Sequence, residues 1–148
     1  MKTKIFLLLF VITGYVQAQI FEPVTWETSV EKVTDSEYDL IATAKIEKGW
    51  HLYSQTVPEG GPVATSFSFE GNSNYLKKGN TTEEKGHTVN DPIFEMKITY
   101  FADRAVFMQR IKLRNTKPFE IKGSVTFMVC DDSRCLPPTT KDLTFNIN

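Results

Sequence analysis

The chain has 148 residues, with 17 Lys and Arg against 18 Asp and Glu and a formal net charge of −1 at pH 7. A chain that is close to neutral and has no cluster of basic residues lacks the electrostatic footprint of a nucleic-acid-binding protein. Its length is enough for one ordinary domain and no more.

The first 18 residues have the pattern of a secretory signal peptide. Two lysines precede an apolar run over residues 5–16, and residues 16–18 read Val-Gln-Ala, which ends in the small residue that signal peptidase requires. The run is too short to span a bilayer, and no later stretch approaches the ~20 apolar residues of a membrane helix. We therefore expect residues 19–148 to form one exported domain that is not embedded in the membrane. Without the two lysines it has 15 basic and 18 acidic residues, a net charge of −3.

From residue 24 onward, apolar and polar residues alternate in one segment after another, a pattern typical of half-buried antiparallel strands. The alternating segments are 24–31, 38–47, 67–69, 94–100, 107–113, 125–129 and 143–147. No window sustains a helical period for ten residues. Seven to nine short strands in about 130 residues predict an all-β fold, an immunoglobulin-like antiparallel β-sandwich. A small barrel is the alternative, and most of the eighteen aromatic residues are expected in the core of either fold.

One connection lacks this alternation. Residues 77–92 read KKGNTTEEKGHTVNDP, which is polar and interrupted by glycines. A structureless loop of this length inside a compact domain is uncommon and is usually functional or mobile. Because the segment runs into Ile93 and Phe94, we expect its end to carry apolar side chains toward a neighbouring surface.

The only two cysteines, Cys130 and Cys135, lie in the segment VCDDSRCLPP. A metal site is not expected, because His51 and His87 have no ligand spacing relative to the pair. Most cysteine pairs of exported proteins are structural, but a six-residue loop gains only about 2 kcal/mol from a disulfide by chain entropy. A pair this close in sequence can also open and close with little disturbance of the fold. The residues favour a redox pair and leave a structural disulfide open.

The neighbours of the cysteines predict different surroundings for the two sulfur atoms. Asp131 and Asp132 disfavour a thiolate, and Arg134 acts partly against them. The spacing is not that of a CxxC motif, and no helix follows that would stabilise a thiolate. Cys130 ends a strand whose pattern carries it into the sheet, whereas Cys135 follows a turn and precedes two prolines that suit an exposed edge. We therefore expect Cys135 to be the more accessible cysteine.

Three stretches together resemble the N-terminal periplasmic domain of DsbD, the thiol:disulfide interchange protein. They are GSVTFMVCDDSRCLPPTTKDLTF, KGWHLYSQ and NDPIFEMKITYF, and the cysteine hairpin followed by Leu-Pro-Pro is the most specific part. The resemblance covers most of the mature chain. It implies an immunoglobulin-like fold in the periplasm that carries electrons, as a dithiol, from a membrane thiol reductant to thioredoxin-like proteins. Disulfide isomerases and the thioredoxins of cytochrome c maturation are among the substrates that it implies.

The resemblance also implies roles for single residues. Cys135 matches the cysteine that forms mixed disulfides, and Cys130 matches its resolving partner. The stretch from Asp91 to Phe94 matches a cap loop over the pair, with Phe94 or Ile93 as the shielding side chain. Two further residues fall where the family keeps aromatic side chains beside the site, namely Tyr53 and His51.

This sequence departs from the family pattern at three points. The DsbD domain precedes a membrane segment and a thioredoxin-like domain, which this chain lacks, so we expect a standalone domain whose reductant is a separate protein. The cysteines are one residue closer than in the best-known member, and a histidine stands where a tyrosine is expected. The predicted chemistry is thiolate attack through a mixed disulfide, with no bound cofactor. The alternative is a non-catalytic envelope binding module with a structural disulfide in its hairpin.

Overall fold

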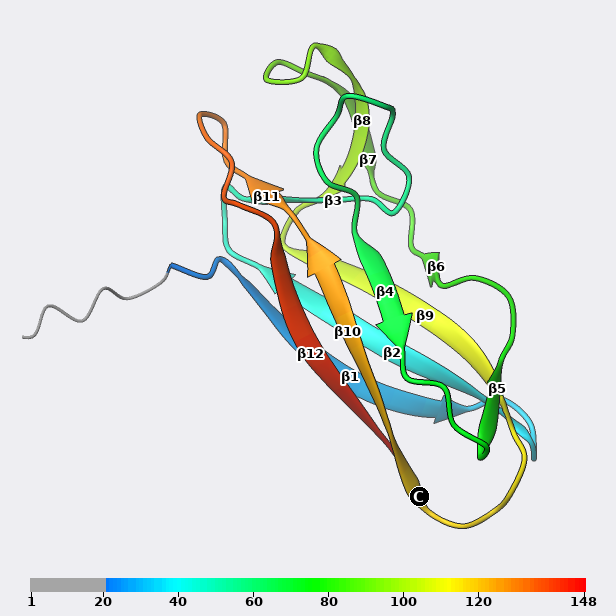
Figure 1. Cartoon of the computed structure of the whole chain (residues 1–148). Coiled ribbons are helices and arrows are strands. Elements are labelled where there is room, and N and C mark those ends of the chain that lie inside the picture. The colour runs from blue at the N-terminus through cyan, green and yellow to red at the C-terminus, as the bar shows by residue number, and fades with distance from the viewer. Residues whose placement is uncertain (1–20) are drawn as a thin grey trace, which may run out of the picture.

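The computed structural model describes residues 21–148, and this part of the chain forms twelve β-strands and no helix (Figure 1). The strands are β1 (Val24–Lys32), β2 (Glu37–Ile46), β3 (His51–Tyr53), β4 (Ser66–Phe69), β5 (Tyr75–Lys77), β6 (Thr82–Glu83), β7 (His87–Asp91), β8 (Met96–Phe101), β9 (Arg104–Leu113), β10 (Phe119–Phe127), β11 (Val129–Cys130) and β12 (Thr139–Ile147). The predicted signal peptide, residues 1–18, lies outside the described residues. Within residues 21–148 there is no helix with the length and apolar character needed to cross a membrane.

Two antiparallel sheets face each other and form the body of the molecule (Figure 1). One has the strand order β1-β2-β9-β5, with β6 also paired to β9, and the other has the order β12-β10-β4. The alternating residues of their long strands are buried between them: Leu40, Ala42, Ala44 and Ile46 of β2, Ala105, Phe107 and Ile111 of β9, Ile121, Val125 and Phe127 of β10, and Leu143, Phe145 and Ile147 of β12. The predicted antiparallel β-sandwich is confirmed. The sheets are separate and do not close into the small barrel that was the alternative.

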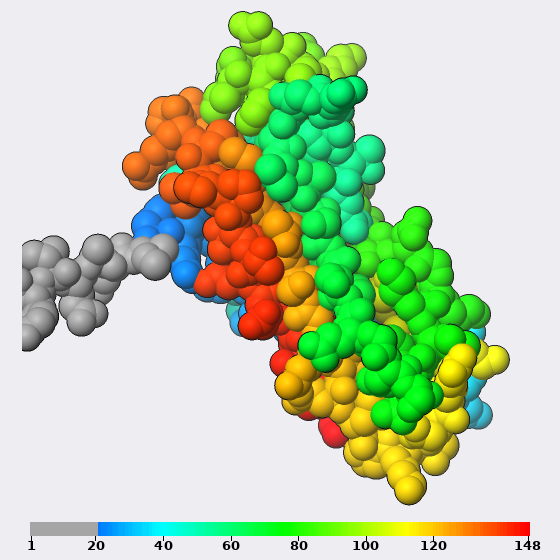
Figure 2. Space-filling model, viewed as in Figure 1, coloured from blue at the N-terminus to red at the C-terminus, as the bar shows by residue number. Residues whose placement is uncertain are grey.

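A third sheet, with the strand order β11-β3-β8-β7, lies at one end of the sandwich (Figure 1). The short strand β11 joins it through the pairs Val129–Leu52 and Cys130–His51. Figure 2 shows the cysteine hairpin (orange) and the segment around residue 93 (light green) at this same end of the molecule. The third sheet therefore brings together stretches that are far apart in the sequence.

The segment 77–92 is more ordered than we expected from its sequence, so the prediction of a structureless loop is wrong. It contains β6 and β7, and all five residues of β7 pair with β8. The strand β6 pairs with β9, and the buried side chain of Gln109 fixes the residues before it, because its Nε2 donates to the carbonyl of Lys78 (3.2 Å) and its Oε1 accepts from Thr81 Oγ1 (3.0 Å). Backbone pairing and one buried amide thus order the segment without any apolar alternation.

Candidate functional site

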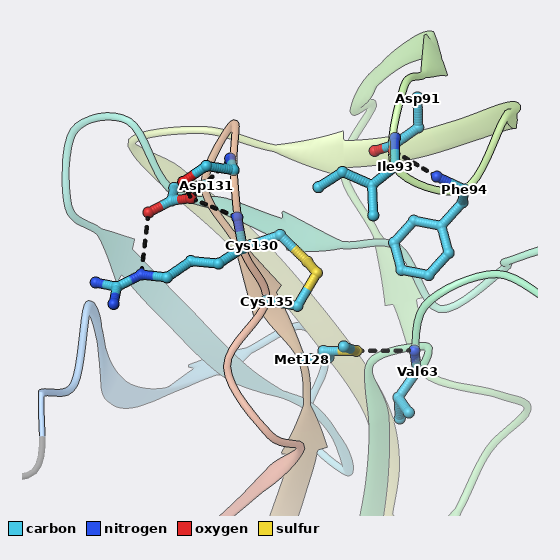
Figure 3. The surroundings of a disulfide bond; sticks show 10 residues. Val63, Asp91, Ile93, Phe94, Met128, Cys130, Asp131 and Cys135 are labelled. Carbon is cyan, nitrogen blue, oxygen red and sulfur yellow. Dashed lines mark hydrogen bonds and ion pairs between the residues drawn. A yellow bond between two sulfur atoms is a disulfide. The ribbon is translucent and has the colours of Figure 1, made fainter.

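The two cysteines form a disulfide across a hairpin at the end of the molecule (Figure 3). The N–H of Asp131 donates to the carbonyl of Arg134 (2.9 Å). On the other side of the pair, the N–H of the residue after Cys135 donates to the carbonyl of the residue before Cys130 (2.9 Å). The cysteines are therefore a non-hydrogen-bonded pair, the position in an antiparallel ladder where facing Cα atoms are closest. Their Cα atoms lie 4.0 Å apart.

The side chain of Asp131 organises the turn between the cysteines. Its Oδ1 accepts from the N–H of Ser133 (2.9 Å), the hydroxyl of Ser133 (2.9 Å) and the N–H of Arg134 (2.8 Å). These bonds, the one from the Ser133 N–H first among them, lower the pKa of Asp131 because they stabilise the ionised carboxylate. The acidic residue that we expected to act on the thiolate thus also closes the turn.

The guanidinium of Arg134 has two partners in the structure. Its Nε lies 3.5 Å from Asp131 Oδ2, and its Cζ lies 5.8 Å from the centroid of the Trp50 ring. A cation over the face of an indole ring is attracted by the ring quadrupole. The positive charge that we expected to support a Cys135 thiolate is therefore shared with Asp131 and Trp50.

The two cysteine residues differ in exposure in the predicted order. Cys130 is 1% exposed, whereas Cys135 is only half-buried. Cys130 belongs to a small cluster of buried residues that is separate from the core of the sandwich, and its other fully buried members are Tyr53 and Ile98. The half-buried residues packed against this cluster are Val57, Phe94, Met96, Tyr100, Met128 and Cys135. The disulfide thus lies in an apolar setting of its own.

A tight turn after β7 directs Phe94 toward the disulfide (Figure 3). Asp91 Oδ1 accepts from the N–H groups of Ile93 (2.8 Å) and Phe94 (3.1 Å), and the carbonyl of Asp91 accepts from the N–H of Glu95 (2.8 Å). Glu95 has a φ of 54°, so the chain reverses there, and β8 begins at Met96 rather than at Phe94 as the alternation indicated. Phe94 packs against the cysteine cluster, whereas Ile93 is 42% exposed.

Tyr53 and His51 lie on β3, directly beside the hairpin. The Tyr53 ring meets Phe94 edge to face, with centroids 6.2 Å apart and an interplanar angle of 87°. Burial raises the pKa of Tyr53, and the negative charge of Asp91 raises it further. His51 is paired with Cys130 in the sheet, and its ring centroid lies 4.2 Å from that of Tyr100. The structure therefore brings the sequence-predicted site residues together at one end.

A cleft of about 180 Å³ opens between the turn that starts at Asp91 and the cysteine hairpin. It is lined by His51, Tyr53, Val89, Asp91, Pro92, Ile93, Tyr100, Asp131 and Asp132. No group of three or more His, Cys, Asp or Glu residues within residues 21–148 is arranged to hold a metal ion.

Sequence reasoning missed one segment that borders the site, residues 57–63. The N–H of Val63 donates to the sulfur of Met128 (3.4 Å), and Val57 packs against the cysteine cluster (Figure 3 shows Val63 and Met128). The chain just before this segment is fixed by Glu83, which accepts from the hydroxyl of Ser54 and from the N–H of Gln55 (2.8 Å). Its valines are isolated among prolines and glycines, so no periodic pattern marks them in the sequence.

Similar proteins agree with this description. The family model described as thiol:disulfide interchange protein DsbD, N-terminal, matches residues 19–147. Curated protein sequences give no match. The reduced DsbD N-terminal domain of Neisseria meningitidis is similar with a TM-score of 0.52 and 15% identity, covering 83% of this chain and 90% of that one.

Two further solved structures are similar. The Neisseria meningitidis DsbD N-terminal domain in its complex with the PilB N-terminal domain has a TM-score of 0.54 and 15% identity, and covers 85% of this chain and 87% of that one. The N-terminal periplasmic domain of ScsB from Proteus mirabilis has a TM-score of 0.52 and 16% identity, and covers 84% of this chain and 44% of that one. At such identities these structures show the fold, which is immunoglobulin-like. With the family model matched over almost the whole chain, the chain belongs to the family of N-terminal domains of the thiol:disulfide interchange protein DsbD.

Proposed function

We propose that this chain is a periplasmic dithiol/disulfide carrier. It passes electrons from a membrane thiol reductant to periplasmic thioredoxin-like proteins, including those of cytochrome c maturation, through Cys130 and Cys135. The observation that carries the proposal is the placement of the disulfide at one end of the sandwich, in a small cluster apart from the main core. A disulfide in that position can open without removing a contact between the two large sheets.

The exchange follows the chemistry of thiols and disulfides. The thiolate of reduced Cys135 attacks a disulfide sulfur of the partner, which forms a mixed disulfide and releases the partner's second thiol. Cys130 then attacks the sulfur of Cys135, the intermolecular bond breaks, and the partner leaves as a dithiol. The partner gains two electrons, and this chain is left with the Cys130–Cys135 disulfide until the membrane reductant restores the dithiol. The half-buried Cys135 and the buried Cys130 suit these two roles.

The turn from Asp91 to Phe94 acts as a cap in this proposal. Phe94 covers the cysteine pair between encounters, and Asp91 fixes the turn that aims it. Tyr53 packs edge to face against the Phe94 ring and supports it, and His51 lines the cleft beside the hairpin. Apolar cover keeps small oxidants away from the reduced thiols, and a docking partner displaces it.

Relatives support two parts of the proposal. The Neisseria meningitidis DsbD N-terminal domain forms a complex with the PilB N-terminal domain, which supports a protein as the partner of this chain. The same domain exists in a reduced form, which supports a dithiol state in this fold.

The test is to trap the mixed disulfide. Cys130→Ser and Cys135→Ser are each mixed, in reduced form, with an oxidised periplasmic thioredoxin-like protein and run on non-reducing gels. We expect Cys130→Ser to accumulate a covalent complex, because it keeps the attacking sulfur and lacks the resolving one, and Cys135→Ser to accumulate much less. The double variant is the control and forms no complex. Equal trapping by both single variants contradicts the division of roles, and trapping by neither favours the non-catalytic binding module with a structural disulfide.

A further inference from the structure

A carrier that opens its disulfide must bring the two sulfurs back together in each cycle. How readily it does so depends on the effective concentration of one thiol at the other, which is high only if the reduced hairpin stays closed. The question is therefore which contacts close the hairpin between Cys130 and Cys135 once the covalent bond is gone.

The backbone alone contributes little at the turn. Among the described residues, one backbone hydrogen bond joins two residues of the turn between the cysteines. It runs from the N–H of Asp131 to the carbonyl of Arg134. The side chain of Asp131 contributes three more, to the N–H and hydroxyl of Ser133 and to the N–H of Arg134, all between 2.8 and 2.9 Å. Hydrogen bonds to a charged acceptor are roughly twice as strong as neutral ones. Most of the bonding that closes the turn therefore ends on one carboxylate.

The turn is also tied to the body of the molecule. The guanidinium of Arg134 links Asp131 Oδ2 (3.5 Å) to the ring of Trp50 (5.8 Å to the centroid), and Trp50 is a buried member of the main core. Phe21 also packs against Trp50, with the two ring centroids 5.4 Å apart. The arm that carries Cys135 is thus tied to a residue of the main core, outside the cysteine cluster.

The neighbouring Asp132 has a different setting. It is exposed, and no side-chain hydrogen bond or ion pair of Asp132 occurs among the described residues. Because Asp131 and Asp132 carry the same charge beside the same cysteines, a comparison of the two separates the geometry of the turn from the electrostatic effect of a carboxylate on a thiolate.

We propose that Asp131 is a positioning residue that keeps the hairpin closed in the dithiol state and thereby sets the equilibrium between dithiol and disulfide. This inference rests on the proposed exchange at Cys130 and Cys135. The closed turn raises the equilibrium constant for disulfide formation, and the disulfide raises the equilibrium constant for closing the turn by the same factor, because such coupling is reciprocal. Loss of the turn bonds therefore shifts the chain toward the dithiol.

The experiment measures that equilibrium with glutathione. Glutathione disulfide accepts two electrons and two protons and becomes two molecules of glutathione, while the two thiols of the chain lose their protons and form the Cys130–Cys135 bond. The fraction of disulfide is read by alkylating the free thiols at a series of glutathione ratios and resolving the products by mass. The variants are Asp131→Ala, Asp131→Asn and Asp132→Ala.

We expect Asp131→Ala to lower the equilibrium constant for disulfide formation about tenfold, equal to about 30 mV in potential. Asp132→Ala removes the same charge and stays within about twofold of the wild type, since no turn contact is lost. Asp131→Asn keeps an oxygen that accepts the same N–H groups but without the charge, so its constant should lie about threefold below the wild type, between the wild type and Asp131→Ala. This pattern assigns the shift to the turn and not to charge.

Three results overturn the inference. They are an Asp131→Ala constant equal to that of the wild type, an Asp132→Ala shift as large as that of Asp131→Ala, and an Asp131→Asn shift as large as that of the alanine variant. If Asp131→Ala does not fold, Arg134→Ala takes its place, because it removes the link to Trp50 and is expected to shift the constant in the same direction by about threefold. A wild-type chain whose disulfide does not exchange with glutathione at any ratio overturns the proposed function as well, whereas an exchanging wild type with unshifted variants overturns the positioning role alone.

Discussion

The body of the sandwich and the end that carries the cysteines are held together by very different numbers of buried residues. Nineteen buried residues form the main core, most of them from the two large sheets and three from the third sheet (Leu52, Phe101 and Val129), whereas three buried residues form the core of the cysteine cluster. The cluster is completed by half-buried side chains from the cap turn, from β8 and from the neighbouring loops. The stability of the domain therefore resides in the body, and the chemistry lies where a local rearrangement disturbs few contacts.

A core truncation in the body is expected to have the largest effect. Phe107 is 1% exposed and its ring packs against those of Trp26, Phe67 and Phe101. Phe107→Ala should lower the free energy of unfolding by about 3–5 kcal/mol, because it removes buried apolar area and leaves a cavity. Urea denaturation followed by circular dichroism measures this. The matched change at the other end, Phe94→Ala, should cost less than half as much, and equal losses would contradict the separation of the two regions.

Reduction of the disulfide is expected to have the next largest effect on stability. Opening a six-residue loop should lower the free energy of unfolding by about 2 kcal/mol or less. The measurement is chemical denaturation of the wild type with and without reductant, with the Cys130→Ser, Cys135→Ser double variant as the control that reductant should not change. If cooperative unfolding is lost on reduction, the disulfide is a structural element of the body and the comparison fails.

The cap should affect the reactivity of the thiols more than the stability of the domain. Because Phe94 packs against the cysteine cluster, Phe94→Ala should speed the reaction of the reduced thiols with a small oxidant about tenfold, which equals a barrier change of about 1.4 kcal/mol. Stopped-flow measurement of thiol loss gives the rate. Ile93→Ala is the matched control, since Ile93 is exposed and adjacent, and should change the rate little. An unchanged rate in Phe94→Ala removes the cap role.

The body could be predicted from the sequence because a strand that buries one face has apolar residues at every second position. In β2, β9, β10 and β12 the alternating residues are the buried ones, so pattern and structure agree. The cysteine pair is visible for a different reason, since its close spacing admits only a hairpin. The cap turn was suggested by a resemblance, and its geometry rests on Asp91 bonding to the next two N–H groups.

What the sequence did not indicate lies mainly at the cysteine end. The first four residues of β7 are exposed, so the strand has no alternation and is ordered by pairing with β8 alone. The segment 57–63 reaches the site through the bond from the Val63 N–H to the Met128 sulfur, a contact across 65 residues that no local pattern encodes. The position of Arg134 over Trp50 is likewise a long-range contact. Local alternation of apolar and polar residues predicts the strands of the body, whereas the site is formed by contacts between residues far apart in the sequence.

The smallest expected effect concerns alkaline pH and the closed state of the cysteine end. Burial and the charge of Asp91 raise the pKa of Tyr53 above the value of about 10 that it has in the unfolded chain. Its contribution to stability is therefore fully present below pH 10 and is lost as the pH rises toward the higher pKa of the folded state, because the unfolded phenol ionises first. Between pH 8 and 10.5 the wild type should lose about 1 kcal/mol more than Tyr53→Phe in urea denaturation. Equal losses in the two proteins would mean that Tyr53 ionises within the folded domain, and hence that the cluster around the disulfide is open to water.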